Sequence, residues 1–252
     1  RRAPRQEAPG RSLPNLPPGF MAGSVQYVQS GFSFNNTPLI NSGGQVAFSI
    51  PTNYGQMLMS ESRTMSPPRV VAYQGQPAPG LGNVSFLSFP SMTINDDGYL
   101  AFNATLTGIG VTTENEESIW VEEGGTLRLI AREGDPAPGG GFYNILYPPA
   151  LSANGEVAFS SFLKEGLGGV NFTNDFAVYK YTLPAGTVQL IMRDGMDVPG
   201  FPAGIYFDTP VVVPSINNVG QVAFYAQIAG APEYQFNGDS IWATTPSGVL
   251  TP

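Results

Sequence analysis

The chain contains no cysteine and no histidine among its 252 residues. Without cysteine there are no disulfide bonds and no thiolate chemistry, and without histidine the commonest general base and metal ligand is missing. A Ser-His-Asp triad is therefore impossible, and the sequence has no Gly-x-Ser-x-Gly nucleophile elbow either. No apolar run reaches the length of about 18 residues that a membrane-spanning helix needs. We expect no membrane insertion and no cofactor.

Charge is also scarce, because only 12% of the residues are charged and the net charge is −8. An acidic protein repels nucleic acids and anionic membranes, so neither is an expected partner. The first residues are an exception, with four arginines close together. This basic arm is either a solvated tail or a segment that docks on an acidic surface, its own or a neighbour's. The four arginines are Arg1, Arg2, Arg5 and Arg11.

A phrase of the form Asn-x-x-Gly-x-x-Ala-Phe recurs four times, about every 59 residues. With 31 glycines, 24 prolines and 42% hydrophobic residues, the chain has the composition of a turn-rich β protein and not of a disordered one. Regular spacing of this kind predicts a repeat architecture. The copies span residues 41–48, 95–102, 152–159, where serine replaces asparagine, and 217–224.

Each repeat offers about four short apolar runs separated by turn residues, which predicts one four-stranded sheet per repeat. We therefore expect an all-β, β-propeller-like fold of about four blades of roughly 59 residues, as a closed ring or an open stack. The predicted division is an N-terminal arm at 1–36 and repeats near 37–80, 81–139, 140–200 and 201–252. Aromatics at equivalent positions indicate blade-packing core, with sugar stacking as the alternative. The predicted core comprises Phe48, Phe102, Phe159, Phe224, Trp120, Tyr179 and Trp242.

The ends of the chain match the two ends of a blade's fourth strand. Val249 and Leu250 correspond to its start, and the segment that ends at Gly10 corresponds to its far end. The N-terminal segment could thus complete the fourth blade, either within one molecule, which is the simpler reading, or between subunits by strand addition. In the second case the predicted subunit interface comprises Arg1, Arg2, Arg5, Arg11, Val249 and Leu250. The first residue is arginine, which indicates either a removed leader or a shortened chain, and we expect an exported protein whose leader is removed.

Two groups of acidic residues could bind a cation. Asn95-Asp96-Asp97-Gly98 resembles part of a calcium loop, but the spaced acids and the closing glutamate of the full motif are missing, and a simple turn explains it. We predict no metal site and keep Asp96 and Asp97 as weak candidates. The second group is either a solvated rim or a weak cation site, and it comprises Glu114, Glu116, Glu117, Glu122 and Glu123.

A glycosidase would need two carboxylates that face each other across a sugar. The sequence does not bring any two of the candidates together, so we expect no enzyme. These candidates are Asp96, Asp97, Asp175, Asp208 and Asp239. Glycosylation sequons occur at Asn35, Asn83, Asn103 and Asn171, although turns rich in asparagine also produce such triplets by chance.

The repeated octapeptide, together with the phrase Arg-Glu-Gly-Asp-Pro-Ala-Pro-Gly at 132–139, resembles the bacterial choice-of-anchor tandem-repeat proteins. The resemblance covers about residues 37–252. It implies an exported surface or extracellular protein, often held by a C-terminal anchoring signal, and it brings no catalytic residues. This chain shows no such anchor, which leaves either a processed anchor or retention by self-assembly.

Together these features predict a non-enzymatic extracellular structural protein, a subunit of a filament, sheath or surface layer. Its expected partner is itself, through N-terminal strand addition to the acidic fourth blade. The alternative is a monomeric secreted propeller that binds a glycan or a protein with its loops, and a secreted hydrolase comes third.

Overall fold

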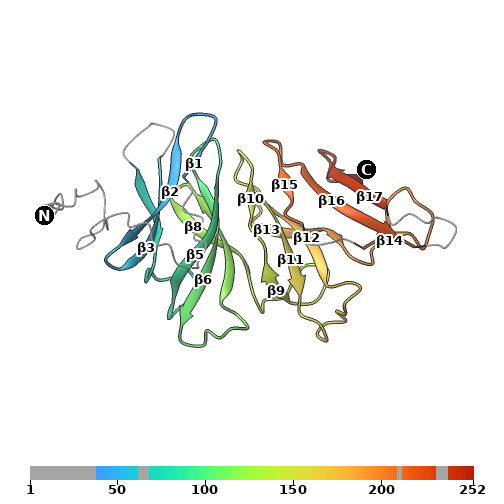
Figure 1. Cartoon of the computed structure of the whole chain (residues 1–252), viewed down its shortest axis with the longest axis horizontal. Helices are drawn as coiled ribbons and strands as arrows, with labels where there is room; N and C mark the ends of the chain where they lie inside the picture. The colour runs from blue at the N-terminus through green and yellow to red at the C-terminus, as the bar shows by residue number, and fades with distance from the viewer. Residues whose placement is uncertain (1–37, 62–67, 209–211, 231–237) are drawn as a thin grey trace, which may run out of the picture.

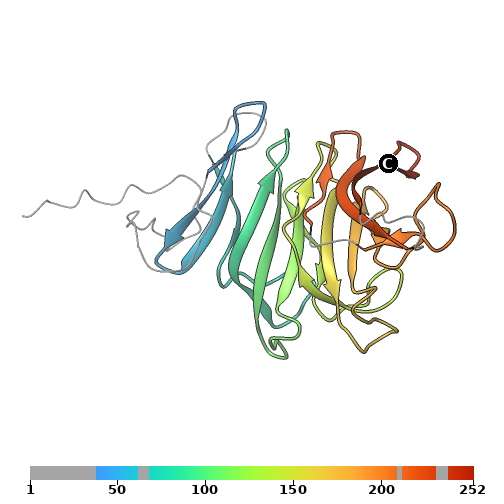
Figure 2. The same ribbon diagram turned by 45° about the vertical axis from the view of Figure 1, so that its right-hand side comes forward.

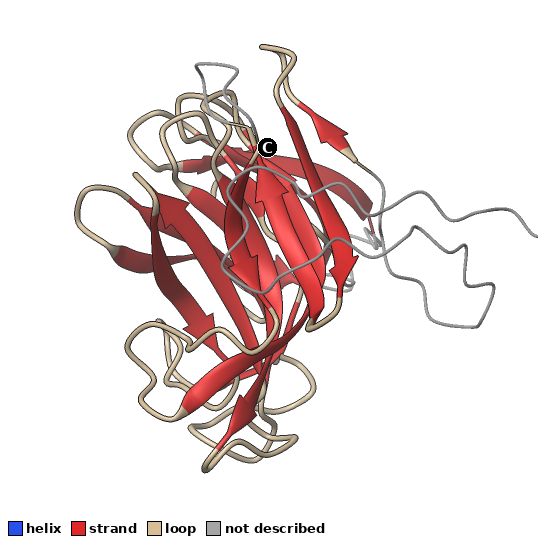
Figure 3. Ribbon diagram, turned by 90° about the vertical axis from the view of Figure 1, so that its left-hand side faces the viewer, coloured by secondary structure: helices blue, strands red, loops and turns tan. Residues whose placement is uncertain are grey.

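The computed structural model describes residues 38–61, 68–208, 212–230 and 238–252. These residues form 18 strands and no helix, and the strands build four antiparallel sheets that follow one another along the chain (Figures 1 and 3). The predicted all-β, propeller-like fold with four blades is therefore confirmed. In the described part of the chain no helix is long and apolar enough to cross a membrane. The predicted arm at 1–36, with its four arginines, lies outside the described residues.

Each sheet uses a contiguous part of the chain. Sheet 1 comprises β1 (Leu39–Ile40), β2 (Val46–Thr52), β3 (Gly55–Ser60) and β4 (Arg69–Tyr73). Sheet 2 comprises β5 (Val84–Ile94), β6 (Leu100–Gly108), β7 (Glu117–Glu123) and β8 (Thr126–Arg132). Sheet 3 comprises β9 (Tyr143–Leu146), β10 (Ala150–Leu151), β11 (Val157–Leu163), β12 (Phe176–Thr182) and β13 (Thr187–Arg193). Sheet 4 comprises β14 (Tyr206–Phe207), β15 (Ser215–Ile216), β16 (Val222–Ala229), β17 (Gly238–Thr244) and β18 (Leu250–Thr251).

The fifth strand of sheets 3 and 4 is a fragment of the first strand. β9 and β10 both pair with β11, and β14 and β15 both pair with β16. In sheet 2 the equivalent strand, β5, is continuous, but its register shifts twice between Phe86 and Ser91. All four sheets are thus variants of one four-stranded blade, and the Ala-Phe strand is second in each.

The repeated Asn-x-x-Gly phrase forms the turn between the first and second strands. In sheet 2 the Asn95 Oδ1 accepts hydrogen bonds from the backbone N–H groups of Asp97 and Tyr99, both at 3.0 Å. Gly98 has a φ of 79°, which L-residues with a side chain rarely adopt. The turn therefore needs a side chain that accepts hydrogen bonds from its own backbone, asparagine in three copies and serine in the third, and a glycine at the fourth position, which explains why the phrase recurs.

Neighbouring sheets pack face to face and bury the aromatic residues between them. Phe102 pairs with Trp120 across sheet 2, and both side chains pack in the core shared with sheet 1. The buried indole N–H is satisfied because the Trp120 Nε1 donates to the Ser118 Oγ at 2.9 Å, and that hydroxyl donates to the carbonyl O of Ala104 at 2.9 Å. In sheet 4 the same relay links Trp242 to the Ser240 Oγ at 2.9 Å.

Six of the seven predicted core aromatics are at most 4% exposed. They are Phe102, Phe159, Phe224, Trp120, Tyr179 and Trp242. The seventh, Phe48, is only half-buried. Each buried aromatic pair faces the preceding sheet, and no described sheet packs on that face of sheet 1.

The four sheets stand in a row, with sheet 1 at one end and sheet 4 at the other (Figures 1 and 2). Three core clusters join sheet 1 to sheet 2, sheet 2 to sheet 3, and sheet 3 to sheet 4. No core cluster of described residues joins sheet 1 to sheet 4. The row curves, because the Nδ2 of Asn218 in the turn of sheet 4 lies 3.3 Å from the Asp96 Oδ2 in the turn of sheet 2. The described residues therefore form an open stack of blades.

Candidate functional site

The four Asn-x-x-Gly turns gather at one end of the stack and bond to one another. The Asn41 Nδ2 donates to the carbonyl O of Asn95 at 2.8 Å, and the Asn95 Nδ2 donates to the carbonyl O of Ser152 at 3.1 Å. The Asn154 Nδ2 continues the series by donating to the carbonyl O of Asn218 at 3.2 Å. Asn41 and Asn95 thus serve twice, since each shapes its own turn and also binds the turn of the next blade. In the third copy, Ser152 shapes the turn and Asn154 makes the link.

The two weak metal candidates belong to this chain of turns. The Asp96 carboxylate accepts hydrogen bonds from the Ser42 Oγ at 2.6 Å and from the Asn218 Nδ2 at 3.3 Å. Asp97 lines a neighbouring cavity of about 400 Å³ between sheets 2 and 3. Within the described ranges no three His, Cys, Asp or Glu side chains gather as a metal site would require. Through its contacts with Ser42 and Asn218, Asp96 in the turn of sheet 2 connects sheets 1, 2 and 4.

Three of the five acidic residues around β7 form ion pairs, each with a different cation. Glu122 is 2% exposed and pairs with Arg69 of sheet 1, so the expected solvated rim is wrong for this residue. Glu114 is exposed, and its carboxylate lies 2.7 Å from the Lys164 Nζ, a hydrogen bond that lowers the pKa of Glu114. Glu123 pairs with Arg128. These carboxylates connect sheets or border the surface, each with its own cation.

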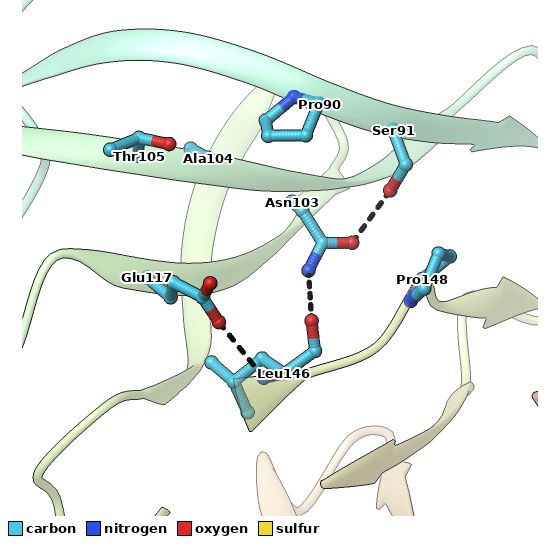
Figure 4. Close-up of a pocket in the computed structure, with 8 residues that line it drawn as sticks. All are labelled: Pro90, Ser91, Asn103, Ala104, Thr105, Glu117, Leu146 and Pro148. Atoms are coloured by element: carbon cyan, nitrogen blue, oxygen red, sulfur yellow. Dashed lines mark hydrogen bonds between the residues drawn. The ribbon is translucent and has the colours of Figure 1, made fainter. Parts of the chain in front are cut away.

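A different set of polar side chains forms hydrogen bonds with the backbone of the first strand of the following sheet. In sheet 2 the Glu117 Oε2 accepts the backbone N–H of Leu146 at 3.0 Å, while the Asn103 Nδ2 donates to the carbonyl O of Leu146 at 3.0 Å (Figure 4). The Ser91 Oγ donates to the Asn103 Oδ1 at 2.6 Å and orients that amide. A cavity of about 190 Å³ lies beside this arrangement. One residue of sheet 3 is thereby held at both its N–H and its C=O.

Sheet 1 holds sheet 2 in the same way. The Gln56 Oε1 accepts the backbone N–H of Phe89 at 2.9 Å, and its Nε2 donates to the carbonyl O of Phe89 at 3.3 Å. Gln56 stands three residues before Met59, as Glu117 stands three residues before Trp120. Met59 and Trp120 are equivalent, because each pairs with the phenylalanine of the Ala-Phe strand in its sheet. We call such a pair of backbone contacts a backbone clamp. Its acceptor is the side chain at the Gln56 and Glu117 position.

In sheet 4 the clamp position is occupied by Asp239, and its partners come from the same sheet. The Tyr225 hydroxyl donates a short hydrogen bond to the Asp239 Oδ1, and the Gln227 Nε2 donates to the same oxygen at 3.1 Å. This hydrogen bond raises the pKa of Tyr225 and lowers the pKa of Asp239. Tyr225 follows Phe224 directly, as Asn103 follows Phe102. Sheet 4 therefore carries the residues of a backbone clamp on a face against which no described sheet packs.

The apolar centre of the same face is also uncovered. In sheets 1 to 3 the residue just before Met59, Trp120 or Tyr179 is buried. Leu58 is 1% exposed, and Ile119 and Val178 are 0% exposed. In sheet 4 the residue at this position is Ile241, and it is 72% exposed. An isoleucine at the centre of a sheet face with this exposure marks a surface that would gain free energy by packing against another sheet.

The predicted interface residues are distributed over described and undescribed parts of the chain. Val249 is 58% exposed, and Leu250 in β18 is half-buried against the core of sheets 3 and 4. β18 pairs only with Ala243 and Thr244, so the β17 edge from Gly238 to Trp242 has no paired strand among the described residues. The remaining interface residues, Arg1, Arg2, Arg5 and Arg11, lie outside the described residues.

The carboxylates considered for glycoside hydrolysis lie in different parts of the stack. Asp96 and Asp97 belong to the turn of sheet 2, Asp175 precedes β12, Asp208 follows β14, and Asp239 lies in β17. Sequence reasoning named Asp239 only as one of these acids and did not single out Tyr225, Gln227 or Ile241. The signal was present, because aligning the repeats on Trp120 and Trp242 places Asp239 at the position of Glu117.

Comparisons with known proteins add a family to this description. A comparison with curated proteins finds no match. Among solved structures, TolB from Acinetobacter baumannii matches with a TM-score of 0.42 and 13% identity, over 91% of this chain and 46% of that one. The chain thus spans about half the length of that structure, and the fold assignment rests on the four sheets themselves. A family described as a family of unknown function (DUF7453) matches residues 15–166 and again residues 140–252. The chain belongs to this family, DUF7453.

Proposed function

We propose that the protein is a non-catalytic, extracellular structural subunit whose copies associate end to end. The observation that carries this proposal is the uncovered outer face of sheet 4. Ile241 is 72% exposed there, whereas its counterparts inside the stack are at most 1% exposed. In repeat proteins a sheet face of this kind is normally buried against the next repeat. A second copy would supply the missing layer.

The opposite end of the stack supports the same proposal. On the outer face of sheet 1, Ile40 of β1 is 71% exposed and Phe48 and Ile50 of β2 are half-buried. Their neighbours on β3, Met57 and Met59, are at most 1% exposed, so only the β1–β2 side of this face is accessible.

At each interface between described sheets, the face that carries Ile119 or its equivalent packs against the next sheet. The face of that next sheet is the one with its buried aromatic pair, such as Phe159 and Tyr179. The β1–β2 side of sheet 1 and the outer face of sheet 4 therefore offer complementary surfaces for a contact between copies. A contact between unlike faces closes into a ring or continues as a filament.

Strand addition is a second way in which copies could join. The β17 edge from Gly238 to Trp242 offers backbone N–H and C=O groups to an incoming strand, and an edge of this kind is a template for pairing. The donor in this version is the N-terminal arm, which lies outside the described residues. The extracellular location rests on the resemblance of the repeat phrase to exported surface proteins, and cell fractionation with antibody detection tests it.

The test is the particle mass across a concentration series, by light scattering and negative-stain microscopy. We expect assemblies from the unaltered chain and their loss in Ile241→Glu. Ile109→Glu is the matched control, because Ile109 is 79% exposed but lies in a loop after β6. Deleting residues 1–23 separates strand addition, which the deletion abolishes, from face packing, which survives it. A monodisperse particle near 27 kDa at all concentrations would contradict both versions.

A cavity favours the alternative, a binding module. Between sheets 1 and 2 lies a cavity of about 400 Å³ lined in part by Gln56, Gln74 and Leu87. This volume is within the range of small-molecule pockets, and the lining combines amides with an apolar side chain as sugar sites do. If the chain is monomeric, binding of glycans to an array, abolished by Gln74→Ala, is the result expected from this function.

A further inference from the structure

The backbone clamps inside the stack show what the outer face of sheet 4 is shaped to receive. At two internal interfaces a side chain in the third strand accepts the N–H of one residue of the next sheet. That residue is Phe89 for Gln56 and Leu146 for Glu117. In both cases an amide nitrogen of the same face donates to the carbonyl O of that residue. The third interface keeps half of this arrangement, since the Ser160 Oγ donates to the carbonyl O of Val212.

Sheet 4 carries both parts of a clamp, and no strand among the described residues is held by them. The Asp239 carboxylate occupies the acceptor position, and its Oδ2 accepts no hydrogen bond from any described residue. Tyr225 and Gln227, which occupy the donor side, donate to the Asp239 Oδ1 instead. Asp239 is exposed, Tyr225 and Gln227 on β16 are half-buried, and Ile241 lies on the same face of β17 as Asp239. The polar and apolar parts of an internal interface are thus reproduced on a face that no described sheet covers.

We propose that Asp239, Tyr225 and Gln227 form a backbone clamp that receives the first strand of a second copy of this chain, with Ile241 packed beneath that strand. The proposal rests on the proposed end-to-end assembly and specifies its contact. Asp239 accepts a backbone N–H of the incoming strand, and Gln227 or Tyr225 donates to the C=O of the same residue. Two hydrogen bonds to one residue fix the register of the strand, as they do for Leu146.

The partner is a second copy because its sheet 1 offers the complementary surface. The aromatic face of each internal sheet packs on the face that carries the clamp of the preceding sheet. On the equivalent face of sheet 1, the β1–β2 side is accessible, with Ile40 71% exposed and Phe48 half-buried, while Met59 on β3 is 1% exposed. In the sequence, Phe32-Ser33-Phe34 precedes Phe48 at the spacing that separates Phe86 and its neighbours from Phe102. Those earlier residues lie outside the described part of the chain.

Three substitutions test the clamp by sedimentation velocity across a concentration series. Asp239→Ala removes the acceptor, and we expect the concentration for half-assembly to rise by about tenfold to a hundredfold, the usual effect of losing a hydrogen bond to a charged group. Asp239→Asn keeps an acceptor oxygen, so its concentration for half-assembly should lie between those of the unaltered chain and Asp239→Ala. Asp197→Ala, which removes an exposed carboxylate between sheets 3 and 4, is the matched control and should change nothing.

Cross-linking tests the identity and direction of the partner. Because the chain has no cysteine, Ile241→Cys and Phe48→Cys each carry one thiol. A short bifunctional thiol reagent should yield a covalent dimer only when the two variants are mixed. Dimers of Ile241→Cys alone would mean that sheet 4 pairs with itself and would overturn the proposal.

The clamp and the proposed function fail in different ways. If Ile241→Glu abolishes assembly while Asp239→Ala does not change it, the clamp is wrong and end-to-end packing stands. If the unaltered chain is monomeric at every concentration, both are wrong. Support for the clamp requires that Asp239→Ala and Ile241→Glu weaken assembly and that each monomer keeps the far-ultraviolet circular dichroism of the unaltered chain.

Discussion

Replacing Arg69 by methionine should destabilise the stack far more than replacing its partner. The Glu122 carboxylate is 2% exposed at the interface between sheets 1 and 2, and the Arg69 guanidinium donates to both of its oxygens, with Nη2 2.8 Å from Oε2. Without Arg69, the carboxylate stays buried without its cation. Breaking a buried pair in this way costs about 3–5 kcal/mol, and we expect the free energy of unfolding to fall by that amount.

Replacing Glu122 by glutamine should cost less, because the charged group left without its partner, Arg69, is partly exposed. Arg69 is 28% exposed, donates to the carbonyl O of Gly98 at 3.2 Å and lies over the Tyr99 ring at 5.8 Å from its centroid. In Glu122→Gln the guanidinium can turn to water, and the glutamine still accepts a hydrogen bond. We expect a loss of about 1 kcal/mol. The double variant should recover most of the loss of Arg69→Met, because the carboxylate charge is gone.

The assay is urea unfolding of the four proteins of this double-mutant cycle. Trp120 lies two residues from Glu122 on the same face of β7 and reports on this interface by fluorescence once Trp242, the second tryptophan, is replaced by phenylalanine in all four proteins, and circular dichroism reports on all four sheets. The midpoints of both probes must coincide before free energies are compared. Equal losses for the two single variants, or additive losses in the double variant, would refute a buried pair that couples the sheets.

Three further outcomes follow from individual residues. Tyr179→Phe should stabilise the protein by about 1 kcal/mol, because the buried hydroxyl has no hydrogen-bond partner among the described residues. Burial also raises the pKa of Tyr179, so stability falls as pH rises above about 10, and urea unfolding at alkaline pH should show a smaller fall for the variant. Gly108→Ala should cost at least about 3 kcal/mol, since φ is 138° and a Cβ would lie 2.2 Å from a backbone oxygen. Gly110→Ala, at φ 81° in open space, should cost about 1 kcal/mol in the same urea assay. In a host that glycosylates sequons, peptide mass spectrometry should find Asn103 unmodified, because it is 8% exposed and its amide donates to a backbone oxygen, whereas Asn171 is exposed.

The repeat made most of the fold predictable from sequence. A turn that needs asparagine or serine at one position and a left-handed glycine three residues later leaves the same phrase wherever it occurs, and the strand after it must then be the Ala-Phe strand. Phe102 and Trp120 could be assigned to the core because their equivalents recur in the later repeats. Recurrence replaces the alignment of relatives that would otherwise show which side of each strand is buried.

Which face remains open could not be predicted from local sequence. The tripeptide Ser-Ile-Trp occurs at 118–120 and again at 240–242, yet Ile119 is 0% exposed and Ile241 is 72% exposed. Both strands are equally apolar, and the difference lies only in whether another sheet follows. Glu122 was misjudged for a related reason. Its partner, Arg69, lies 53 residues away in the preceding sheet, so the acidic run gives no local sign of burial.

The polar residues of the outer face allow an opposite interpretation, and one experiment decides between the two. Terminal repeats of stacked proteins often carry a polar outer face that keeps copies apart, and Asp239, Tyr225 and Gln227 could serve as such a cap. A cap and a clamp predict effects of opposite sign: Asp239→Ala should promote association if the carboxylate repels a second copy, and should weaken it if the carboxylate binds one. Two features favour the clamp. Asp239 stands at the position from which Glu117 accepts a backbone N–H, and the centre of the face is an exposed isoleucine, which a cap would replace by a polar residue. We therefore expect the half-assembly concentration of Asp239→Ala to rise, and a fall would assign these residues to a cap.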